Sequence, residues 1–163
     1  MTALLVLVPC RNEGRVVGRR LRNLALCEWP ASERPHRIVV IDDHSSDDTA
    51  AIAASVSAEL RAQRAATLPG LLITVVPSAG RPGKSSAIAR GLAERAGEAL
   101  IVLTDADVLF ERRALVLLAQ ALSADSRLGM VCGAQRFVPA LRESAEPAST
   151  RRSPAWSTKE SRA

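Results

Sequence analysis

Two acidic side chains, Asp105 and Asp107, are separated by a single residue within the largely apolar stretch IVLTDADVLF at residues 101–110. A short apolar run predicts a buried strand, and a carboxylate that loses contact with water needs a partner. Carboxylate oxygens suit Mg²⁺ or Mn²⁺, which proteins usually hold through one or two carboxylates together with substrate phosphates. The pair therefore indicates a site for a divalent cation and a diphosphate. For an isolated pair, however, the favoured interpretation is simpler: Asp107 caps the helix predicted to follow.

A second acidic cluster, VVIDDHSSDDT at residues 39–49, directly follows another apolar run. A carboxylate at the end of a strand can accept hydrogen bonds from the N–H of a base or from ribose hydroxyls. Asp47 is better interpreted as a helix cap, because Asp is preferred immediately before a helix. His44 is expected to be an exposed turn residue, since a chain with 2 histidines is a poor candidate for a histidine-based site.

A third cluster, SAGRPGKS at residues 78–85, is close to the phosphate-binding pattern GxxxxGK[ST]. It follows a predicted strand and precedes a predicted helix, so a P-loop-like nucleoside triphosphatase is an alternative function. However, Ser78 stands where that pattern has its first glycine. A P-loop also leaves the acidic cluster at 39–49 and the segment PCRNEG at 9–14 unexplained.

The elements that must position these clusters alternate along the chain. Strands are predicted from short apolar runs, and helices from apolar residues at a spacing of three and four. The predicted strands are 4–8, 38–41, 71–76, 100–104 and 130–133, and the predicted helices are 15–26, 49–66, 84–95 and 111–122. This alternation indicates an α/β fold with a mainly parallel sheet, a three-layer α/β/α sandwich. Ligands of such sheets bind beyond the carboxyl ends of the strands, where the polar clusters fall.

Composition limits the partners of the chain. Hydrophobic residues make up 47% of the 163 residues, which suits one folded domain. We expect this domain at residues 1–142 and a disordered tail at 143–163, where Ser, Pro, Ala and charged residues dominate.

The net charge of +5 favours anionic partners such as nucleotides. No nucleic-acid partner is expected, because aromatic residues are only 2% and no nucleic-acid-binding module is recognisable.

Cysteine usage and hydropathy indicate the compartment. The chain has 3 cysteines, too few and too widely spaced for a disulfide framework or a metal site. The apolar start is too short for a signal peptide, and no stretch approaches the ~20 apolar residues of a membrane span. We therefore expect a reduced protein in the cytoplasm.

Together these clusters resemble four motifs of the inverting family 2 glycosyltransferases of the GT-A fold. VLVPCRNEG is similar to the family's IPxYNEE, VVIDDHSSDDT to VDDGSTDGT, GRPGKSSAIARGL to GGKxxALNxGL, and VLTDADV to the DxD strand. The motifs follow the family's order over roughly residues 4–135. The resemblance implies a Rossmann-like nucleotide-diphospho-sugar transferase. It would take a UDP-sugar in the typical case and use Mn²⁺ or Mg²⁺.

The resemblance also implies roles for residues of the first two motifs. Pro9 and Glu13 would lie at the nucleotide site, and Asp43 would recognise the base, typically uracil. Arg11 stands where the family has an aromatic residue, so a guanidinium would stack on the base or meet a phosphate instead. Further departures from the family's pattern are His44 and Asp48 in place of turn glycines and Ala89 in place of Asn.

Roles at the metal follow from the other two motifs. The resemblance places Lys84 in a loop near the sugar nucleotide. Asp105 would contact the ribose or the metal, and Asp107 would be the main metal ligand, bridging to the diphosphate. The four motifs explain more of the chain than the P-loop alternative does.

The acceptor side of the reaction has no counterpart in the sequence. The family has its catalytic base well beyond the DxD strand, commonly followed by a QxxRW-like motif. After Gly133 the chain offers only Glu143, Glu146 and Glu160 within the tail-like segment, so the base remains unassigned. We expect the donor-binding part of a truncated or longer enzyme, with little transfer by itself. A catalytically inactive nucleotide-sugar-binding remnant is a further alternative.

The remaining expectations concern the acceptor and the location of the longer protein. The acceptor is unknown and would be a lipid, a saccharide or a protein. The resemblance suggests glycosylation in the cell envelope. A C-terminal part outside this chain would associate with the inner face of the cell membrane.

Overall fold

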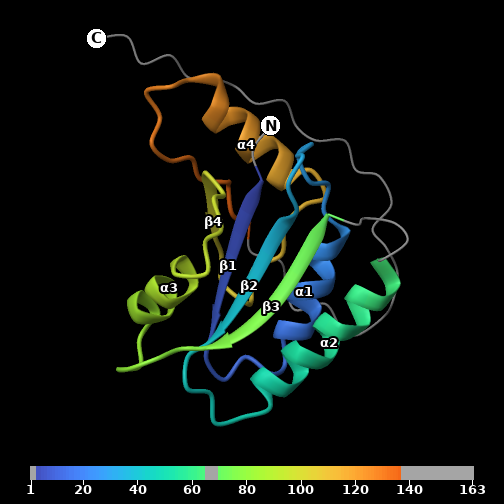
Figure 1. The fold of residues 1–163 in the computed structure, drawn as a ribbon, viewed down its shortest axis with the longest axis vertical. Helices are drawn as coiled ribbons and strands as arrows, with labels where there is room; N and C mark the ends of the chain where they lie inside the picture. Colours follow the sequence, from blue (N-terminus) through green and yellow to red (C-terminus); the bar gives the residue numbers. More distant parts are fainter. Residues whose placement is uncertain (1–2, 65–69, 137–163) are drawn as a thin grey trace. The chain divides into compact units, whose positions relative to one another are not determined.

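The computed structural model describes residues 3–64 and 70–136. Residues 1–133 form one compact unit, which is described below, and residues 134–163 belong to a second. Helices and strands alternate in the first unit (Figure 1), in the order β1 (Leu4–Cys10), α1 (Val17–Leu26), β2 (His36–Asp42), α2 (Thr49–Arg64), β3 (Leu71–Pro77), α3 (Lys84–Leu92), β4 (Leu100–Leu103) and α4 (Ala114–Ala124).

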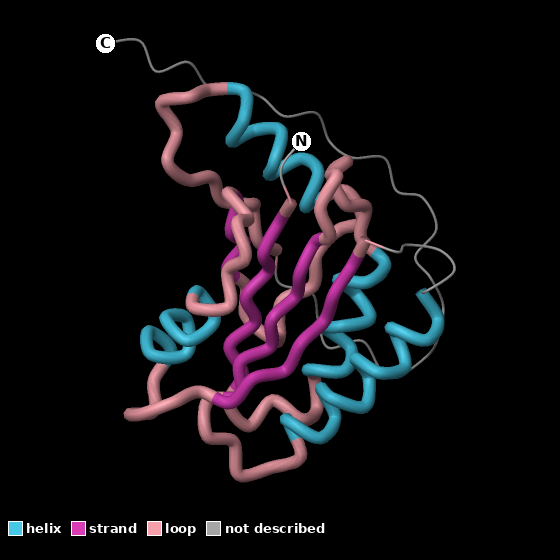
Figure 2. Tube along the Cα trace, viewed as in Figure 1, coloured by secondary structure: helices cyan, strands magenta, loops and turns pink. Residues whose placement is uncertain are grey.

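The sheet is parallel throughout. Its four strands lie in the order β3-β2-β1-β4, and Figure 2 shows them side by side with helices around them. Cys10 is opposite Asp42 in the register, and Leu7 is opposite Leu103. The predicted α/β fold with a parallel sheet is therefore confirmed. The carboxyl ends of β1 and β2 meet at one edge, as the positions of the polar clusters require.

Two hydrophobic cores explain why the strand sequences are apolar without alternation. On one face of the sheet, residues such as Leu4 and Val6 pack with side chains from α1, α2 and α4. On the other face, Leu5 and Leu7 pack with Ala87 of α3. A strand buried on both faces has no polar side to show, so its pattern is a continuous apolar run.

The close approach of α3 to the sheet depends on Gly91. A Cβ atom at this position would lie 2.9 Å from Ile41 Cδ1 and 3.0 Å from Leu7 Cδ2. Real Cβ atoms do not approach so closely, and both neighbours are fully buried. The glycine therefore fixes the height of α3 above the sheet, and with it the position of Lys84 at the start of this helix.

Two features of the strands differ from the predictions. β1 continues through Pro9 to Cys10, because Pro9 lies beyond Leu7, the last residue paired with β4. The proline's missing N–H therefore breaks no ladder bond on that side. The strand predicted at 130–133 is wrong. No strand of the described chain pairs there, and Met130 is 76% exposed, so the segment gains neither hydrogen bonds nor burial.

Within the described ranges, no helix has the length and hydropathy to cross a membrane. The segment 143–163, predicted to be a disordered tail, lies outside the described residues. The boundary at residue 142 therefore stays a prediction.

Candidate functional site

The loops after β1 and β2 are joined by hydrogen bonds at the carboxyl edge of the sheet. The N–H of Asp43 donates to the carbonyl of Cys10 over 2.7 Å. Asn12 has a left-handed backbone with φ 56°, a conformation in which Asn is enriched. Its N–H donates to Ser45 Oγ over 3.0 Å, and its Oδ1 accepts the N–H of Ser46 over 2.8 Å. Asn12, to which the sequence analysis gave no role, therefore ties the two loops together.

The start of α2 is attached to the same junction. The N–H of Glu13 donates to Thr49 Oγ1 over 2.8 Å. The two carboxylate oxygens of Asp47 accept the N–H of Gly14 over 3.1 Å and the N–H of Thr49 over 3.0 Å. A Cβ on Gly14 would lie 3.0 Å from Asp47 Oδ2, so a small residue is needed here. Asp47 therefore holds the beginning of α2, in agreement with its predicted structural role.

Asp43 connects this junction to the loop before α3. Its side chain is nearly buried, and its Oδ2 accepts the N–H of Gly83 over 2.8 Å. Its Oδ1 lies 3.2 Å from Nδ1 of His44. Burial alone would raise the pKa of Asp43, but the hydrogen bonds from Gly83, His44 and Ser78 outweigh burial and lower the pKa below its usual value. Asp43 is thus a carboxylate at neutral pH, fixed in orientation by its neighbours.

His44 occupies an exposed turn, as predicted. Its φ of 59° is again left-handed, a conformation that a glycine adopts without strain. This explains why the resembling family has a glycine at the equivalent position.

Lys84 brings the loops after β3 and β4 together. Its Nζ lies 2.5 Å from Oδ1 of Asp105, and both side chains are half exposed to solvent. In a P-loop, the backbone N–H groups of the loop donate to a phosphate. Here the N–H of Gly83 donates to Asp43 instead, so the P-loop alternative does not fit this loop. The structure thus links Asp43, Lys84 and Asp105, three of the predicted site residues, through one loop.

Glu13 shares an acidic environment with Asp105 and Asp107. Burial raises the pKa of Glu13, and the negative charges of Asp107 and Asp105 raise it further. Asp107 is exposed and has no hydrogen bond or ion pair to any other described side chain. It does not cap a helix, since α4 begins only at Ala114 with Arg113 at its N-cap position. The helix-cap interpretation of Asp107 is therefore wrong.

The two carboxylates of the loop after β4 fit a divalent cation that is shared with a phosphate ligand. The described part of the chain has no group of three or more His, Cys, Asp or Glu side chains that could hold a metal ion. Mg²⁺ and its analogues are usually held by one or two carboxylates plus substrate phosphates, so Asp105 and Asp107 suffice only with such a substrate. A cation between them would also offset the repulsion felt by Glu13.

Asp42 is a candidate that the sequence analysis did not single out. Its Oδ1 is buried and has no hydrogen-bond partner among the described residues. Buried polar atoms are normally satisfied, so such an orphan acceptor suits a ligand that donates. The sequence does not indicate which of the two aspartates has the unpaired oxygen, because Asp42 and Asp43 are adjacent residues of the same type.

Pro9 and Arg11 lie at the carboxyl end of β1 and just beyond it. Pro9 is half-buried as part of β1. Arg11 is exposed on the loop after β1, and its side chain makes no hydrogen bond or ion pair within the described ranges. The structure thus leaves Arg11 free to approach an anionic ligand at this edge.

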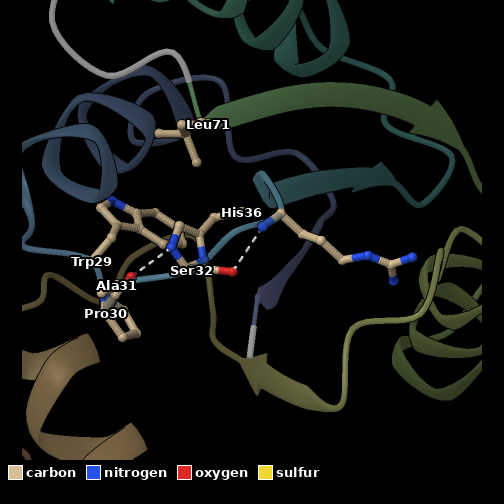
Figure 3. A pocket seen from close by; sticks show the side chains of 8 residues that line it. Trp29, Pro30, Ala31, Ser32, His36 and Leu71 are labelled. Carbon is tan, nitrogen blue, oxygen red and sulfur yellow. Dashed lines mark hydrogen bonds between the residues drawn. The ribbon is translucent and has the colours of Figure 1, made fainter. Parts of the chain in front are cut away.

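A separate pocket lies at the opposite end of the strands (Figure 3). Its volume is about 290 Å³, and its lining includes Trp29, Pro30 and Leu71. His36 contributes its ring, 5.0 Å from that of Trp29. Nδ1 of His36 accepts the N–H of Leu4 over 3.0 Å, so Nε2 carries the proton and donates to the carbonyl of Pro30 over 2.8 Å. These bonds fasten the segment before β2 to the sheet, which is a structural role.

Comparison with known proteins identifies relatives of this chain in sequence and in fold. The sequence model of glycosyl transferase family 2 matches residues 5–161. The probable glycosyltransferase YdaM of Bacillus subtilis is 33% identical over 135 residues, which are 83% of this chain and 30% of YdaM.

Among solved structures, the mannosyltransferase PcManGT of Pyrobaculum calidifontis, in complex with GDP-Man and Mn²⁺, has a TM-score of 0.56 and 29% identity. The match covers 74% of this chain and 31% of that one. TarS 1-349 of S. aureus has a TM-score of 0.55 at 20% identity, over 75% of this chain and 32% of that one, a likeness of fold alone. The chain spans about a third of the length of these relatives.

Proposed function

Since this chain belongs to glycosyltransferase family 2, we propose that it binds a nucleotide-diphospho-sugar, the donor substrate of a glycosyl transfer reaction. The observation that carries the proposal is the convergence of acidic and basic side chains at one edge of the sheet. Asp105 lies 2.5 Å from Lys84, and the charges of Asp105 and Asp107 act on Glu13. Such a site offers carboxylates to the metal ion and an ammonium group to the diphosphate of a metal–diphosphate complex.

Asp105 and Asp107 would hold Mn²⁺ or Mg²⁺, with oxygens of the diphosphate as further ligands. The bound cation would neutralise the negative charge that develops on the leaving nucleoside diphosphate. PcManGT, which carries Mn²⁺ and GDP-Man, supports this choice of cofactor. The ammonium group of Lys84 is half exposed, so it can leave Asp105 and pair with the diphosphate.

The nucleoside would bind at the carboxyl ends of β1 and β2. We assign base recognition to Asp43, which is ionised and fixed by the N–H of Gly83. The buried Oδ1 of Asp42 has no partner in the described chain and would accept a hydrogen bond from the base or the ribose. Pro9 would form part of the floor of this site. Arg11 would contact the base or a phosphate from the exposed loop after β1.

For a protein of the full length of these relatives, we propose inverting transfer to a lipid, saccharide or protein acceptor. An inverting reaction needs a group that takes the proton of the acceptor hydroxyl. The acids that follow Gly133 lie outside the described residues, so we assign this group to no residue. A cytoplasmic location at the inner face of the membrane and a role in the cell envelope also remain proposals.

The test is calorimetric titration of the purified chain with UDP, GDP and ATP, each with Mn²⁺ or Mg²⁺. We expect a nucleoside diphosphate with Mn²⁺ to bind more tightly than ATP with Mg²⁺, and UDP more tightly than GDP. Preference for ATP would favour a nucleoside triphosphatase, and no nucleotide binding at all would contradict the proposed function.

A transfer assay with radiolabelled donor completes the test. The control is the double variant Asp105→Ala/Asp107→Ala, which lacks both proposed metal ligands. We expect little transfer by this chain alone, because a general base typically contributes ~10²–10⁴-fold to a rate. Robust metal-dependent transfer would contradict a purely donor-binding role.

A further inference from the structure

A fully buried arginine lies behind the loop of residues 104–110 that follows β4. This segment is called the acidic loop because it carries Asp105 and Asp107. The side chain of Arg20, on α1, has 0% of its surface exposed. Arginine is almost never fully buried unless paired, yet no carboxylate of the described chain forms an ion pair with Arg20. Its Nε also has no hydrogen-bond partner among these residues. Burying one ion costs roughly several kcal/mol, so the stability of the fold does not explain why an arginine lies at this position.

The contacts of Arg20 are directed at the two ends of the acidic loop. Its Nη2 donates to Thr104 Oγ1 over 2.7 Å, and Thr104 is the residue immediately before Asp105. Its guanidinium carbon lies 4.2 Å from the centre of the Phe110 ring, within the range of a cation–π contact. One side chain therefore contacts both ends of the loop that carries Asp105 and Asp107.

Asn23, one turn further along α1, completes this attachment. Its Oδ1 accepts a hydrogen bond from Nη1 of Arg20 over 2.8 Å. The same oxygen accepts the N–H of Phe110 over 2.8 Å, and Nδ2 donates to the carbonyl of Phe110 over 2.9 Å. The amide of Asn23 thus holds the backbone of Phe110 on both sides.

The acidic loop is therefore fixed from α1 rather than by its own sequence. At its start, Thr104 is further tied to β1, where its N–H donates to the carbonyl of Leu7 over 3.2 Å. Within the loop, the side chain of Ala106 is buried and turns inward, whereas Asp105 and Asp107 on either side remain accessible. Fixing both ends of so short a segment restricts the separation of these two carboxylates.

The charge of Arg20 adds an electrostatic effect. Burial lowers the pKa of Arg20 to about 10, and the negative charges of Asp105 and Asp107 act in the opposite direction. The guanidinium is therefore cationic at neutral pH. It lies behind acidic side chains that repel one another, and it reduces that repulsion before a cation arrives.

We propose that Arg20 and Asn23 are positioning residues that hold the Thr104–Phe110 loop in the conformation needed to bind a metal–diphosphate complex, an inference that rests on the proposed function. Groups that orient metal ligands typically change metal affinity by about 10–100-fold. Neither residue touches the ligand itself. Their effect passes through the backbone of the loop.

The first test measures the loop without any ligand. Hydrogen exchange of residues 104–110 is compared between the wild-type chain, Arg20→Met and Asn23→Ala. The matched control is Arg22→Met on the same helix, where the arginine is exposed and pairs with Glu59 over 2.7 Å. We expect exchange in the loop to accelerate about tenfold or more in the first two variants and to be unchanged in the control. Unchanged exchange in Arg20→Met and Asn23→Ala would overturn the inference.

The second test separates positioning from stability. Arg20→Met removes the desolvation cost of a buried charge, which offsets the loss of the hydrogen bonds to Thr104 and Asn23, so this variant should unfold close to the wild-type temperature. Its affinity for Mn²⁺ in the presence of UDP, measured by electron paramagnetic resonance, should nevertheless fall by about tenfold or more. A merely structural role would lower the melting temperature and leave the affinity of the folded chain unchanged, which would overturn the proposed positioning.

A double-mutant cycle tests the proposed route through Thr104. Thr104→Val removes the hydroxyl that accepts the bond from Arg20 with little change in volume. We expect Arg20→Met/Thr104→Val to weaken Mn²⁺–UDP binding no more than Arg20→Met alone, because each of the two changes removes the same hydrogen bond. Additive losses would contradict this route. If the wild-type chain binds no Mn²⁺–UDP, the proposed function fails, whereas the exchange comparison still decides whether α1 orders the loop.

Discussion

Replacement of Asp43 tests the connection between the base site and the loop that carries Lys84. In Asp43→Ala, the N–H of Gly83 loses the buried carboxylate that accepts its hydrogen bond over 2.8 Å. Hydrogen bonds to a charged group contribute about 1.5–3 kcal/mol, and we expect a loss of about 2–3 kcal/mol for Ala. Asp43→Asn retains one acceptor oxygen without the charge, so about 1 kcal/mol is expected. For a domain of this size, 1 kcal/mol corresponds to a melting-temperature change of roughly 4 °C.

The pH dependence of this effect has a defined sign. Its hydrogen bonds outweigh burial and hold the pKa of Asp43 below its usual value of 3.8. The carboxylate of Asp43 therefore stabilises the fold fully above pH 3.8 and loses this contribution as the pH falls through its lower folded-state pKa. The stability difference between wild type and Asp43→Asn should shrink over the same acidic range.

The assay is thermal unfolding followed by circular dichroism, paired with calorimetric titration of UDP in the presence of Mn²⁺. We expect UDP affinity to fall about tenfold in Asp43→Asn, equivalent to 1.4 kcal/mol. The control is Asp48→Asn, which removes the same charge from an exposed residue of the same loop and should change neither measurement. An Asp43→Ala chain that melts within about 1 °C of wild type would refute the magnitude assigned to the Gly83 bond.

Three further predictions concern the cation site and the segment before β2. Asp107→Ala should abolish Mn²⁺-dependent UDP binding in calorimetry without altering the circular dichroism spectrum, whereas Glu33→Ala, at another exposed acid, should bind normally. Lys84→Met should raise the affinity for Mn²⁺ alone, because Asp105 loses its ion-pair partner, and lower the affinity for UDP; parallel losses of both would contradict this. Burial lowers the pKa of His36 below 6.5, so the unfolded chain takes up the proton first and the free energy of unfolding should fall on acidification. Urea unfolding at about pH 7.5 and about pH 5.5 measures this fall, which should be smaller in His36→Phe.

The fold and the general place of the site could be predicted from the sequence because both depend on local patterns. Strands such as β1 are buried on both faces, so their apolar runs are visible in the sequence without any knowledge of their neighbours. Alternation with helices then makes the sheet parallel, and parallel strands end at one edge. That is why the acids of the second and fourth motifs were expected near one another before any contact was known.

Other features of the site depend on contacts that no local pattern contains. The hydrogen bond from Arg20 to Thr104 joins residues 84 positions apart, and it exists only because α1 packs behind the end of β4. In the sequence, Arg20 is one of many arginines, and no local pattern distinguishes it from the exposed ones. Likewise, Asp42 and Asp43 look alike as adjacent letters, although one carboxylate holds Gly83 and the other retains a buried oxygen without a partner.

Apart from the strand predicted at 130–133, the sequence by itself therefore determined which elements form and at which edge of the sheet the polar clusters lie, because hydrophobic periodicity and chain direction are properties of short segments. The tertiary structure alone decided which strand pairs where, and so excluded the strand predicted at 130–133. It also decided that Asp107 is accessible rather than a helix cap, and that Arg20 is buried. Each of these outcomes depends on packing between distant segments, where burial and hydrogen-bond partners are set by neighbours that the local sequence does not specify.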